Sequence, residues 1–464
     1  MNPTNTKRMF SAAFVFLLWL STPVNTQAQT PSKDKSAVPA DNIQALQQPA
    51  TATSDPSASN QLTSGDQPAQ APIYGFQGVL VETLDGTVVS MQAANETFNP
   101  ASAIKLATAL VALKTFGPEH RFTTGVWISG SFDKTTGTID GNLYISGRDP
   151  SFHYEHAVTV ASQLNSLGIR TITGDLLIAP GFTMNFNRSA QQAGEQFYDT
   201  LDATLRSTEA TRTWVYERTV LGDKISLQTV PSVAVMGEVK VSPVAPGAKL
   251  LLSHKSSRMV DILKVLLCYS NNFMAERIGD TLGGRQSVRR QLISFLNIDP
   301  RELVMSSLSG LGVNRVTPRV MMKIFRALRA ELQKNKLSPS DIMPVAGIDP
   351  GTLADRFPNL PARGSVIAKT GTLTRTDGGA SSLVGQMKTA NEEILLFVIM
   401  NQNGNVLRFR ENQDYLVRQV QNTRGGPKPF NYEPHSLPMR LADTETRTTE
   451  NEYEPILKAV RRGP

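Results

Sequence analysis

Ser102 and Lys105 are the two residues whose types and spacing point most directly to chemistry. They lie three positions apart in the segment PASAIK (residues 100–105), and Asn99 and Pro100 are typical of the first turn of a helix. At that spacing both side chains lie on one face of the helix. A lysine there can accept the proton of the serine hydroxyl if burial or a second cation keeps its amine neutral. The pair therefore predicts a nucleophilic serine with a lysine base, although Ser-x-x-Lys alone also arises often by chance.

Two further motifs combine groups that acyl transfer needs. Ser270-x-Asn272 ends an apolar helical stretch, and Lys369-Thr370-Gly371-Thr372 lies in a strand-like run. Each motif alone has a structural explanation, the former as a polar helix-ending turn and the latter as the end of a strand. Three motifs in this order, each on the type of element that the chemistry uses, favour an active site over coincidence.

The pattern of apolar residues predicts the elements that must position these motifs. Apolar residues at helical spacing follow Lys105 as far as Gly117-Pro118, so the first motif opens a helix. Asp85-Gly86 between two alternating runs indicates a hairpin that leads into this helix. We expect further helices from Met259 and around 288–296, 319–332 and 415–420, and strands at 78–82, 88–91, 366–372, 381–387 and 394–400.

Between the first two motifs the sequence changes character, and we expect an inserted α+β domain at about 119–255. Its middle, from Ser189 to about Lys240, is polar, and there we expect one helical stretch and only weak strands. The predicted elements of the insert are strands at 122–128, 142–145 and 175–178 and helices around 157–167 and 198–205.

Both ends of the chain differ from this globular part. Lys7 and Arg8 precede an apolar run of twelve residues, which is shorter than the roughly 20 that span a bilayer, so residues 1–28 are predicted to be a signal peptide. Residues 29–72 are rich in Ala, Ser, Pro, Gln and Thr and are predicted to be a disordered linker. The polar stretch 423–464 is expected to be a loose C-terminal tail.

Cysteine, histidine and charge narrow the possible functions. Cys268 is the single cysteine, so no intramolecular disulfide can form, and its apolar neighbours predict a buried, inert thiol. His153, Glu155 and His156 suggest a metal site, but a solvated loop is the favoured interpretation and we expect no metal. The net charge of +7 favours anionic polymers in general, and no basic segment with interleaved aromatic residues indicates nucleic acid.

With these motifs in place, the sequence resembles the D-alanyl-D-alanine carboxypeptidase/endopeptidase family, the class C low-molecular-mass penicillin-binding proteins. The resemblance covers most of residues 73–422 and includes the segments GNLY (141–144), GDL (174–176), NRVTP (314–318) and AGIDPGTL (346–353). It implies an α/β fold of the penicillin-binding-protein and serine β-lactamase-like transpeptidase type, an antiparallel sheet flanked by helices with a helical subdomain. The catalytic domain would comprise residues 73–118 and 256–422, interrupted by the insert at 119–255.

The resemblance also implies roles for the motif residues. Ser102 would be acylated, Lys105 would be its general base, and Ser270 would pass a proton to the leaving amine. Asn272 would hold Lys105 and the substrate amide. The substrate carboxylate would be bound by the segment Lys369, Thr370, Gly371 and Thr372, and the N–H groups of Ser102 and Thr372 would form the oxyanion hole.

The implied protein is a serine-type peptidase of the periplasm or the secreted fraction that acts on peptidoglycan peptides. β-Lactam antibiotics would be covalent inhibitors. We expect no cofactor, no nucleic-acid partner and no integral membrane anchor.

Two stretches depart from the family pattern. Where the family usually has Asp-Gly-Ser-Gly-Leu, this chain has SLSGL (307–311), so an expected carboxylate is missing, and the turn at 375–379 is longer than usual. The spacing from Ser102 to Ser270 also indicates a reduced insert. A serine β-lactamase is one alternative, but residues 278–312 lack the Glu-x-x-Leu-Asn-type segment of class A enzymes. A non-catalytic wall-binding scaffold on the same fold is the other.

Overall fold

The structure is a computed structural model, and it describes residues 73–223 and 230–449. The predicted signal peptide and linker therefore lie outside the described residues. Within the described ranges, no helix combines the length and the apolar character that a membrane span requires.

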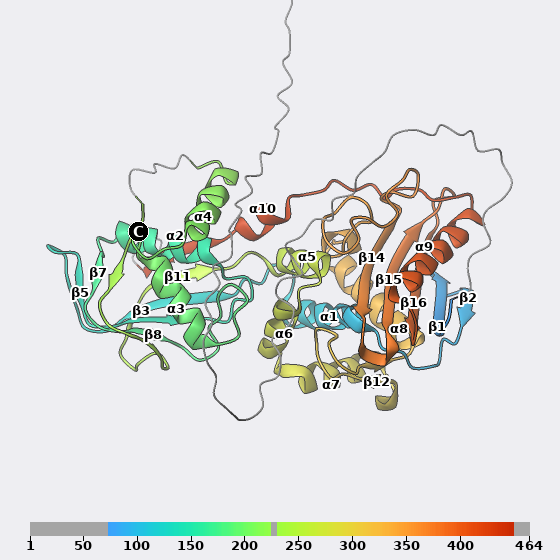
Figure 1. The fold of residues 1–464 in the computed structure, drawn as a ribbon, viewed down its shortest axis with the longest axis horizontal. Coiled ribbons are helices and arrows are strands. Elements are labelled where there is room, and N and C mark those ends of the chain that lie inside the picture. Colours follow the sequence, from blue (N-terminus) through green and yellow to red (C-terminus); the bar gives the residue numbers. More distant parts are fainter. Residues whose placement is uncertain (1–72, 224–229, 450–464) are drawn as a thin grey trace, which may run out of the picture. The chain divides into compact units, whose positions relative to one another are not determined.

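An antiparallel sheet of five strands carries the third motif, and its strand order is β14-β15-β16-β1-β2 (Figure 1). Alternate residues along β16 face two different hydrophobic cores. Val398 and Met400 belong to the core shared with the helices around α1, whereas Phe397 and Ile399 belong to a core on the opposite face, which includes Val417 of α9. Both faces of the sheet are therefore covered, and the predicted hairpin around Asp85-Gly86 is present. The strands are β1 (Phe76–Thr83), β2 (Val88–Gln92), β14 (Val366–Leu373), β15 (Ala380–Lys388) and β16 (Ile394–Gln402).

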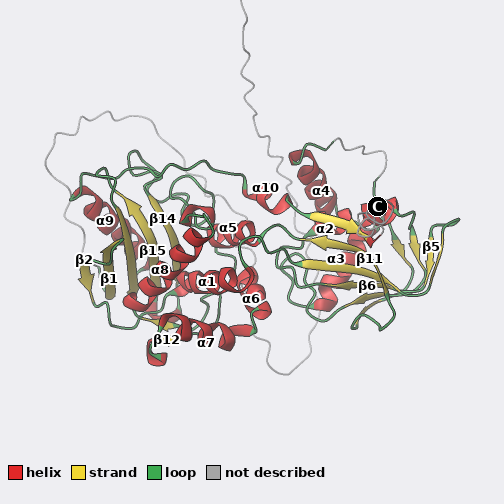
Figure 2. Cartoon of the chain, turned by 180° about the vertical axis from the view of Figure 1, so that it is seen from behind, coloured by secondary structure: helices red, strands yellow, loops and turns green. Residues whose placement is uncertain are grey.

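Helix α1 (Lys105–Phe116) lies at the centre of the helical body (Figure 2). Its residues from Lys105 to Leu113 are all buried, because α5, α6, α7 and α8 all contact it. The helices around it are α5 (Met259–Tyr269), α6 (Asn272–Thr281), α7 (Gly284–Leu296) and α8 (Pro318–Lys334), and α9 (Val406–Asn422) packs on the sheet. Short elements complete this part: β12 (Leu303–Val304), β13 (Arg315–Val316) and 3-10 turns at Pro300–Glu302, Pro339–Asp341 and Thr376–Gly378.

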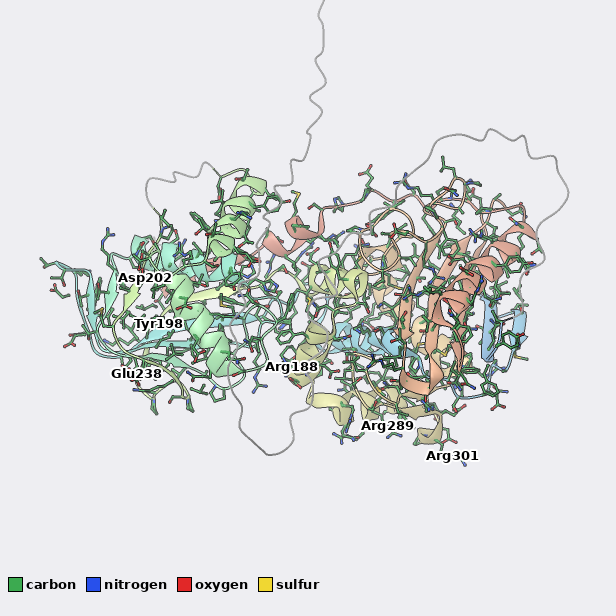
Figure 3. The ribbon with its side chains drawn as sticks, viewed as in Figure 1. Arg188, Tyr198, Asp202, Glu238, Arg289 and Arg301 are labelled. Atoms are coloured by element: carbon green, nitrogen blue, oxygen red, sulfur yellow. The ribbon has the colours of Figure 1, made fainter. Side chains whose placement is uncertain are left out.

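The insert has its own hydrophobic core and two sheets, ordered β10-β8-β6-β3-β11-β17 and β4-β5-β7-β9. The edge strand β17 (Glu445–Thr448) comes from the C-terminal segment. Tyr198 lies on α3 (Figure 3) and donates a hydrogen bond to the carbonyl oxygen of Val235 at 2.8 Å, which ties the helix to the sheet region. The weak strands expected in the polar middle are present as β9 and β10, but the expectation of one helix was wrong. Two helices lie there, and each begins after a capping serine, Ser189 or Ser207. The helices are α2 (Tyr154–Ser166), α3 (Ala190–Leu201) and α4 (Thr208–Val220). The strands are β3 (Thr123–Ile128), β4 (Ser131–Asp133), β5 (Thr138–Asp140), β6 (Leu143–Ser146), β7 (Thr171–Ile172), β8 (Leu176–Ile178), β9 (Ala234–Val235), β10 (Val239–Val241) and β11 (Lys249–Lys255).

The segment after Thr423 is not a loose tail over the described range, contrary to expectation. Helix α10 (Leu437–Ala442) packs on α5, and β17 (Glu445–Thr448) pairs antiparallel with β11 of the insert. Arg440 donates to Asp261 of α5 at 2.8 Å. Backbone pairing and one buried ion pair hold this segment in place. Neither interaction needs apolar residues, so the polar composition of the segment did not indicate that it is ordered.

Candidate active site

The nucleophile candidate Ser102 lies in a 3-10 turn (Ala101–Ile104), and the α-helix begins only at Lys105. The predicted helix start was therefore about one turn too early. Asn99 accepts a hydrogen bond from the backbone N–H of Ala101 at 3.0 Å, and Ala101 has a φ of 46°. The tight turn directs the Ser102 hydroxyl toward the lysine of the following turn.

The Lys105 amine is fully buried and contacts all three groups that a base in this site requires. Its Nζ lies 3.0 Å from Ser102 Oγ and 2.7 Å from Asn272 Oδ1, and it also donates to the carbonyl oxygen of Ser309. Burial, and then the nearby charge of Lys369, holds the pKa of Lys105 well below its ordinary value. The expected meeting of the first and second motifs is thus present.

The hydrogen-bond inventory of a neutral lysine fits this geometry. A neutral amine has two N–H donors and one lone pair, whereas the Asn272 side-chain oxygen and the Ser309 carbonyl oxygen can only accept. Those two acceptors take both donors. The lone pair is left for the proton of Ser102, which is the arrangement that a general base needs.

Ser270 and Lys369 form a second serine–lysine pair. Ser270 ends α5 in the left-handed conformation, with a φ of 58°, and its Oγ accepts a hydrogen bond from Lys369 Nζ at 2.9 Å. Lys369 also donates to the carbonyl oxygen of Thr370 at 2.8 Å. Its side chain is fully buried, and this burial lowers its pKa to about 7. The second and third motifs therefore meet, as predicted.

The two threonines of the third motif have partners that the sequence did not indicate. Thr370 donates to the hydroxyl of Thr352 at 2.7 Å, and Thr352 lies in the AGIDPGTL segment. The Thr372 hydroxyl accepts from Arg410 Nη2 at 2.8 Å. Thr352 could have been suspected from its segment, but nothing near Arg410 in the sequence marked it.

Two glycines let the backbone approach the nucleophile turn. A Cβ on Gly371 would lie 2.4 Å from the carbonyl oxygen of Pro100, and one on Gly310 would lie 2.1 Å from that of Ala101. Contacts that short do not occur, so any side chain would push β14 or the 307–311 loop away from Ser102.

The loop with the unusual sequence SLSGL keeps its shape through Ser307 and Glu276. Ser307 Oγ accepts from the N–H of Gly310 at 3.0 Å and donates to the carbonyl oxygen of Leu311 at 2.8 Å. Glu276 on α6 accepts from the N–H groups of Leu308 and Ser309, the latter at 2.9 Å. A carboxylate therefore does support this loop, but it comes from α6 and not from the loop itself.

The long turn after the third motif is anchored to the residue that precedes the nucleophile turn. Asp377 Oδ2 accepts from Asn99 Nδ2 at 2.7 Å, and Arg315 forms a bidentate pair with the same carboxylate. Hydrogen bonds from Arg315 and Asn99 lower the pKa of Asp377 against the effect of its burial. This network links three stretches that border the site.

The histidines of the insert do not lie in a solvated loop, so that interpretation was wrong. His153 caps α2 and His156 is buried, with Glu217 of α4 at 3.9 Å from its Nε2. Glu155, His156 and Glu217 converge closely enough to hold a metal ion. However, His156 Nδ1 accepts from the N–H of His153 at 2.9 Å, so the neutral ring carries its proton on Nε2. That nitrogen has no lone pair for a metal, and the geometry therefore fits poorly with metal binding.

Cys268 is buried as predicted. Its burial raises the pKa of the thiol to about 12, so it is not a nucleophile at neutral pH.

The geometry is that of a serine acyl-transfer enzyme of the penicillin-binding class. A family model described as D-Ala-D-Ala carboxypeptidase 3 (S13) matches residues 69–181 and 206–423, and the chain belongs to this family. This confirms the family, fold class and enzyme class predicted from the motifs.

Known proteins agree with this assignment. The D-alanyl-D-alanine carboxypeptidase of Actinomadura sp. (strain R39) is 25% identical over 421 residues, covering 70% of this chain and 77% of that protein. Among solved structures, Bd3459, a predatory peptidoglycan endopeptidase from Bdellovibrio bacteriovorus, is 21% identical with a TM-score of 0.66, covering 79% of this chain and 97% of that chain. Penicillin-binding protein 4 (dacB) from Haemophilus influenzae is 20% identical with a TM-score of 0.57, covering 75% and 97%. At these identities the two structures show the shared fold.

Proposed function

We propose that this protein cleaves D-Ala-D-Ala stem peptides of peptidoglycan, as a carboxypeptidase and as an endopeptidase, through an acyl-enzyme on Ser102. The observation that carries the proposal is the buried Lys105 amine, 3.0 Å from Ser102 Oγ and with its other two contacts taken by acceptors. A depressed pKa leaves this amine free to act as a base.

The steps follow from the contacts. Ser102 Oγ attacks the carbonyl carbon of the penultimate D-Ala while its proton passes to Lys105 Nζ. The oxyanion is stabilised by the N–H groups of Ser102 and Thr372. When the C–N bond breaks, Ser270 gives its proton to the leaving amine and takes up the proton held by Lys105, so that Lys105 is neutral again. Lys369, 2.9 Å from Ser270 Oγ, stabilises the negative charge that develops on that oxygen. Water then hydrolyses the ester, and Lys105 serves again as the base.

The substrate roles of the remaining motif residues belong to the same proposal. Asn272 holds Lys105 and the substrate amide, and Lys369, Thr370 and Thr372 surround the free carboxylate next to the scissile bond. Gly371 belongs to the same substrate-binding segment and lets β14 lie close to the nucleophile turn. A cross-linked peptide presents a free carboxylate on a D-centre in the same position, which is why endopeptidase activity is included.

Similar proteins support the inhibitor class. One solved relative, Bd3459, is described as acylated by penicillin G, at 22% identity and a TM-score of 0.67. We infer that β-lactams acylate this protein as well. Export to the periplasm or beyond is part of the proposal and rests on the basic and apolar pattern of residues 1–28.

Labelling with fluorescent penicillin tests the function directly. We expect the purified protein to be labelled, the labelled peptide to contain Ser102, and the Ser102→Ala variant to remain unlabelled. A label on another residue would refute the assignment. No label on the folded protein would favour a non-catalytic scaffold, and rapid turnover of the β-lactam would favour a β-lactamase.

A further inference from the structure

Arg410 places a guanidinium group beside the strand that carries the third motif. It lies in the first half of α9, and its Nη2 donates to Thr372 Oγ1 at 2.8 Å. The Thr372 side chain is partly exposed at the end of β14, whereas the motif residues before it are buried. The guanidinium is therefore adjacent to the part of the motif that a substrate can reach.

No carboxylate neutralises Arg410 among the residues that the structure describes. Asp414, one turn later on α9, pairs with Arg356, whose Nε lies 2.9 Å from Asp414 Oδ1. Partial burial and the neighbouring charge of Arg356 lower the pKa of Arg410, and Asp414 opposes them only weakly. A guanidinium still stays protonated at neutral pH. A half-buried cation without an anion is costly, which points to an anionic ligand.

Lys369 is poorly placed to be the sole carboxylate-binding cation. Its amine is fully buried, and two of its donors are directed at Ser270 Oγ and the carbonyl oxygen of Thr370. Because burial lowers its pKa to about 7, it also carries only part of a charge at neutral pH. Among the cations that hydrogen-bond to the third motif in the described residues, Arg410 carries the permanent charge.

We propose that Arg410, together with the Thr372 hydroxyl, binds the free carboxylate that the substrate presents next to the scissile bond. This inference rests on the proposed function, because it names what that site reads. A planar guanidinium can form two parallel hydrogen bonds with a carboxylate, so its contribution is directional as well as electrostatic. In this arrangement Lys369 assists Ser270, and Arg410 sets the requirement for a free acid.

The experiment compares acylation by benzylpenicillin with acylation by its methyl ester, which lacks the carboxylate. For the wild type we expect the acid to react roughly a hundredfold faster than the ester. In Arg410→Gln this ratio should fall by roughly tenfold or more, with the ester rate little changed. Arg410→Lys, which keeps the charge, should give an intermediate ratio. Arg408→Gln is the matched control, because Arg408 is exposed on the same helix and paired with Glu411; its ratio should match the wild type.

The outcomes separate this inference from the proposed function. If Arg410→Gln folds and keeps the wild-type ratio while Ser102 is labelled, Arg410 does not bind the carboxylate, although the function stands. If neither compound labels the wild type, the proposed function itself fails. Should Arg410→Gln not fold, as judged by circular dichroism, Arg410→Lys and Thr372→Val are measured as two separate variants. If both give the wild-type ratio of acid to ester acylation rates, the inference is overturned.

Discussion

Two groups of buried ionisable side chains can be compared in this molecule, one in the candidate active site and one in the insert. The candidate active site buries Lys105 and Lys369, and the insert buries His156, His254 and Glu217. In both, loss of solvent shifts pKa values toward the neutral form: Lys369 to about 7, His156 to about 3 and Glu217 to about 8. A perturbed pKa alone therefore does not distinguish them.

Hydrogen bonding does distinguish the two clusters. The amines of Lys105 and Lys369 have partners in the adjacent motifs, and each contacts a serine hydroxyl. In the insert, His156 Nε2, His254 Nε2 and Glu217 Oε1 have no hydrogen-bond partner among the described residues. His156 and His254 instead pack against the ring of Phe152. The candidate active site is therefore distinguished by amines with shifted pKa values that also hydrogen-bond to serine hydroxyls. In the insert, the side chains with shifted pKa values are packed as part of a core.

Removing the Lys105 amine is expected to give the largest effect. In Lys105→Ala, acylation by fluorescent penicillin should fall below about 1% of the wild-type rate, because no other base among the described residues lies within hydrogen-bond distance of Ser102. Lys114→Ala is the matched control: Lys114 lies on the same helix, is partly exposed, and is 3.6 Å from Glu331. Circular dichroism checks the fold. Near-normal acylation by a folded Lys105→Ala protein would contradict the base assignment.

Local sequence signals were sufficient for the elements that carry the motifs. The strands β14, β15 and β16 and the helices α5, α7 and α8 lie where apolar periodicity placed them, because each buries a regular face. The three motifs also came together as expected. Local signals failed where order depends on a distant partner: β17 is held by β11, and its residues Glu445–Thr448 are polar.

The missed site residues share that cause. Glu276 supports Ser309 from 33 positions away, and Arg410 reaches Thr372 across 38. A short motif cannot indicate contacts between residues that lie so far apart in the sequence. Only the packing of α6 and α9 brings these two residues to the site. In the same way, Glu217 approaches His156 only because α4 packs on α2.

An intermediate effect is expected from the loop that holds the Ser309 carbonyl oxygen against Lys105. Ser307→Ala removes the acceptor for Gly310 N–H and the donor to Leu311. Acylation should slow by about three- to tenfold while the protein stays folded, because a looser loop places the carbonyl less accurately. The acylation rate measures the effect on catalysis, and the melting temperature shows whether the protein stays folded. Ser306→Ala tests the contribution of Leu311 alone, because Ser306 Oγ donates to the same carbonyl oxygen at 3.2 Å. An equal loss there would mean that the bonds to Leu311, rather than the bond to Gly310, are responsible.

The smallest effect on acylation is expected from Glu217→Gln, which changes the insert cluster and leaves the active site intact. The pKa of Glu217 is raised to about 8 in the folded protein, chiefly by burial and then by Glu155, from an ordinary value of 4.5. Below pH 4.5 the side chain is protonated whether the chain is folded or unfolded, so its titration does not change the free energy of unfolding. As the pH rises toward 8, only the unfolded state ionises, and the wild type loses stability that the glutamine variant keeps. The variant should therefore melt at about the wild-type temperature at pH 5 and a few degrees above it at pH 8.

The control for this pH dependence is Glu209→Gln, because Glu209 is exposed on the same helix and should change the melting temperature little at either pH. Penicillin acylation by Glu217→Gln should stay within about twofold of the wild type at both pH values, because its carboxyl is not among the partners of Lys105 or Ser102. Destabilisation of Glu217→Gln at pH 8 would mean that the carboxylate is ionised and paired with His156. A large loss of acylation would mean that the insert core is coupled to the active site, and the contrast between the two clusters would then be wrong.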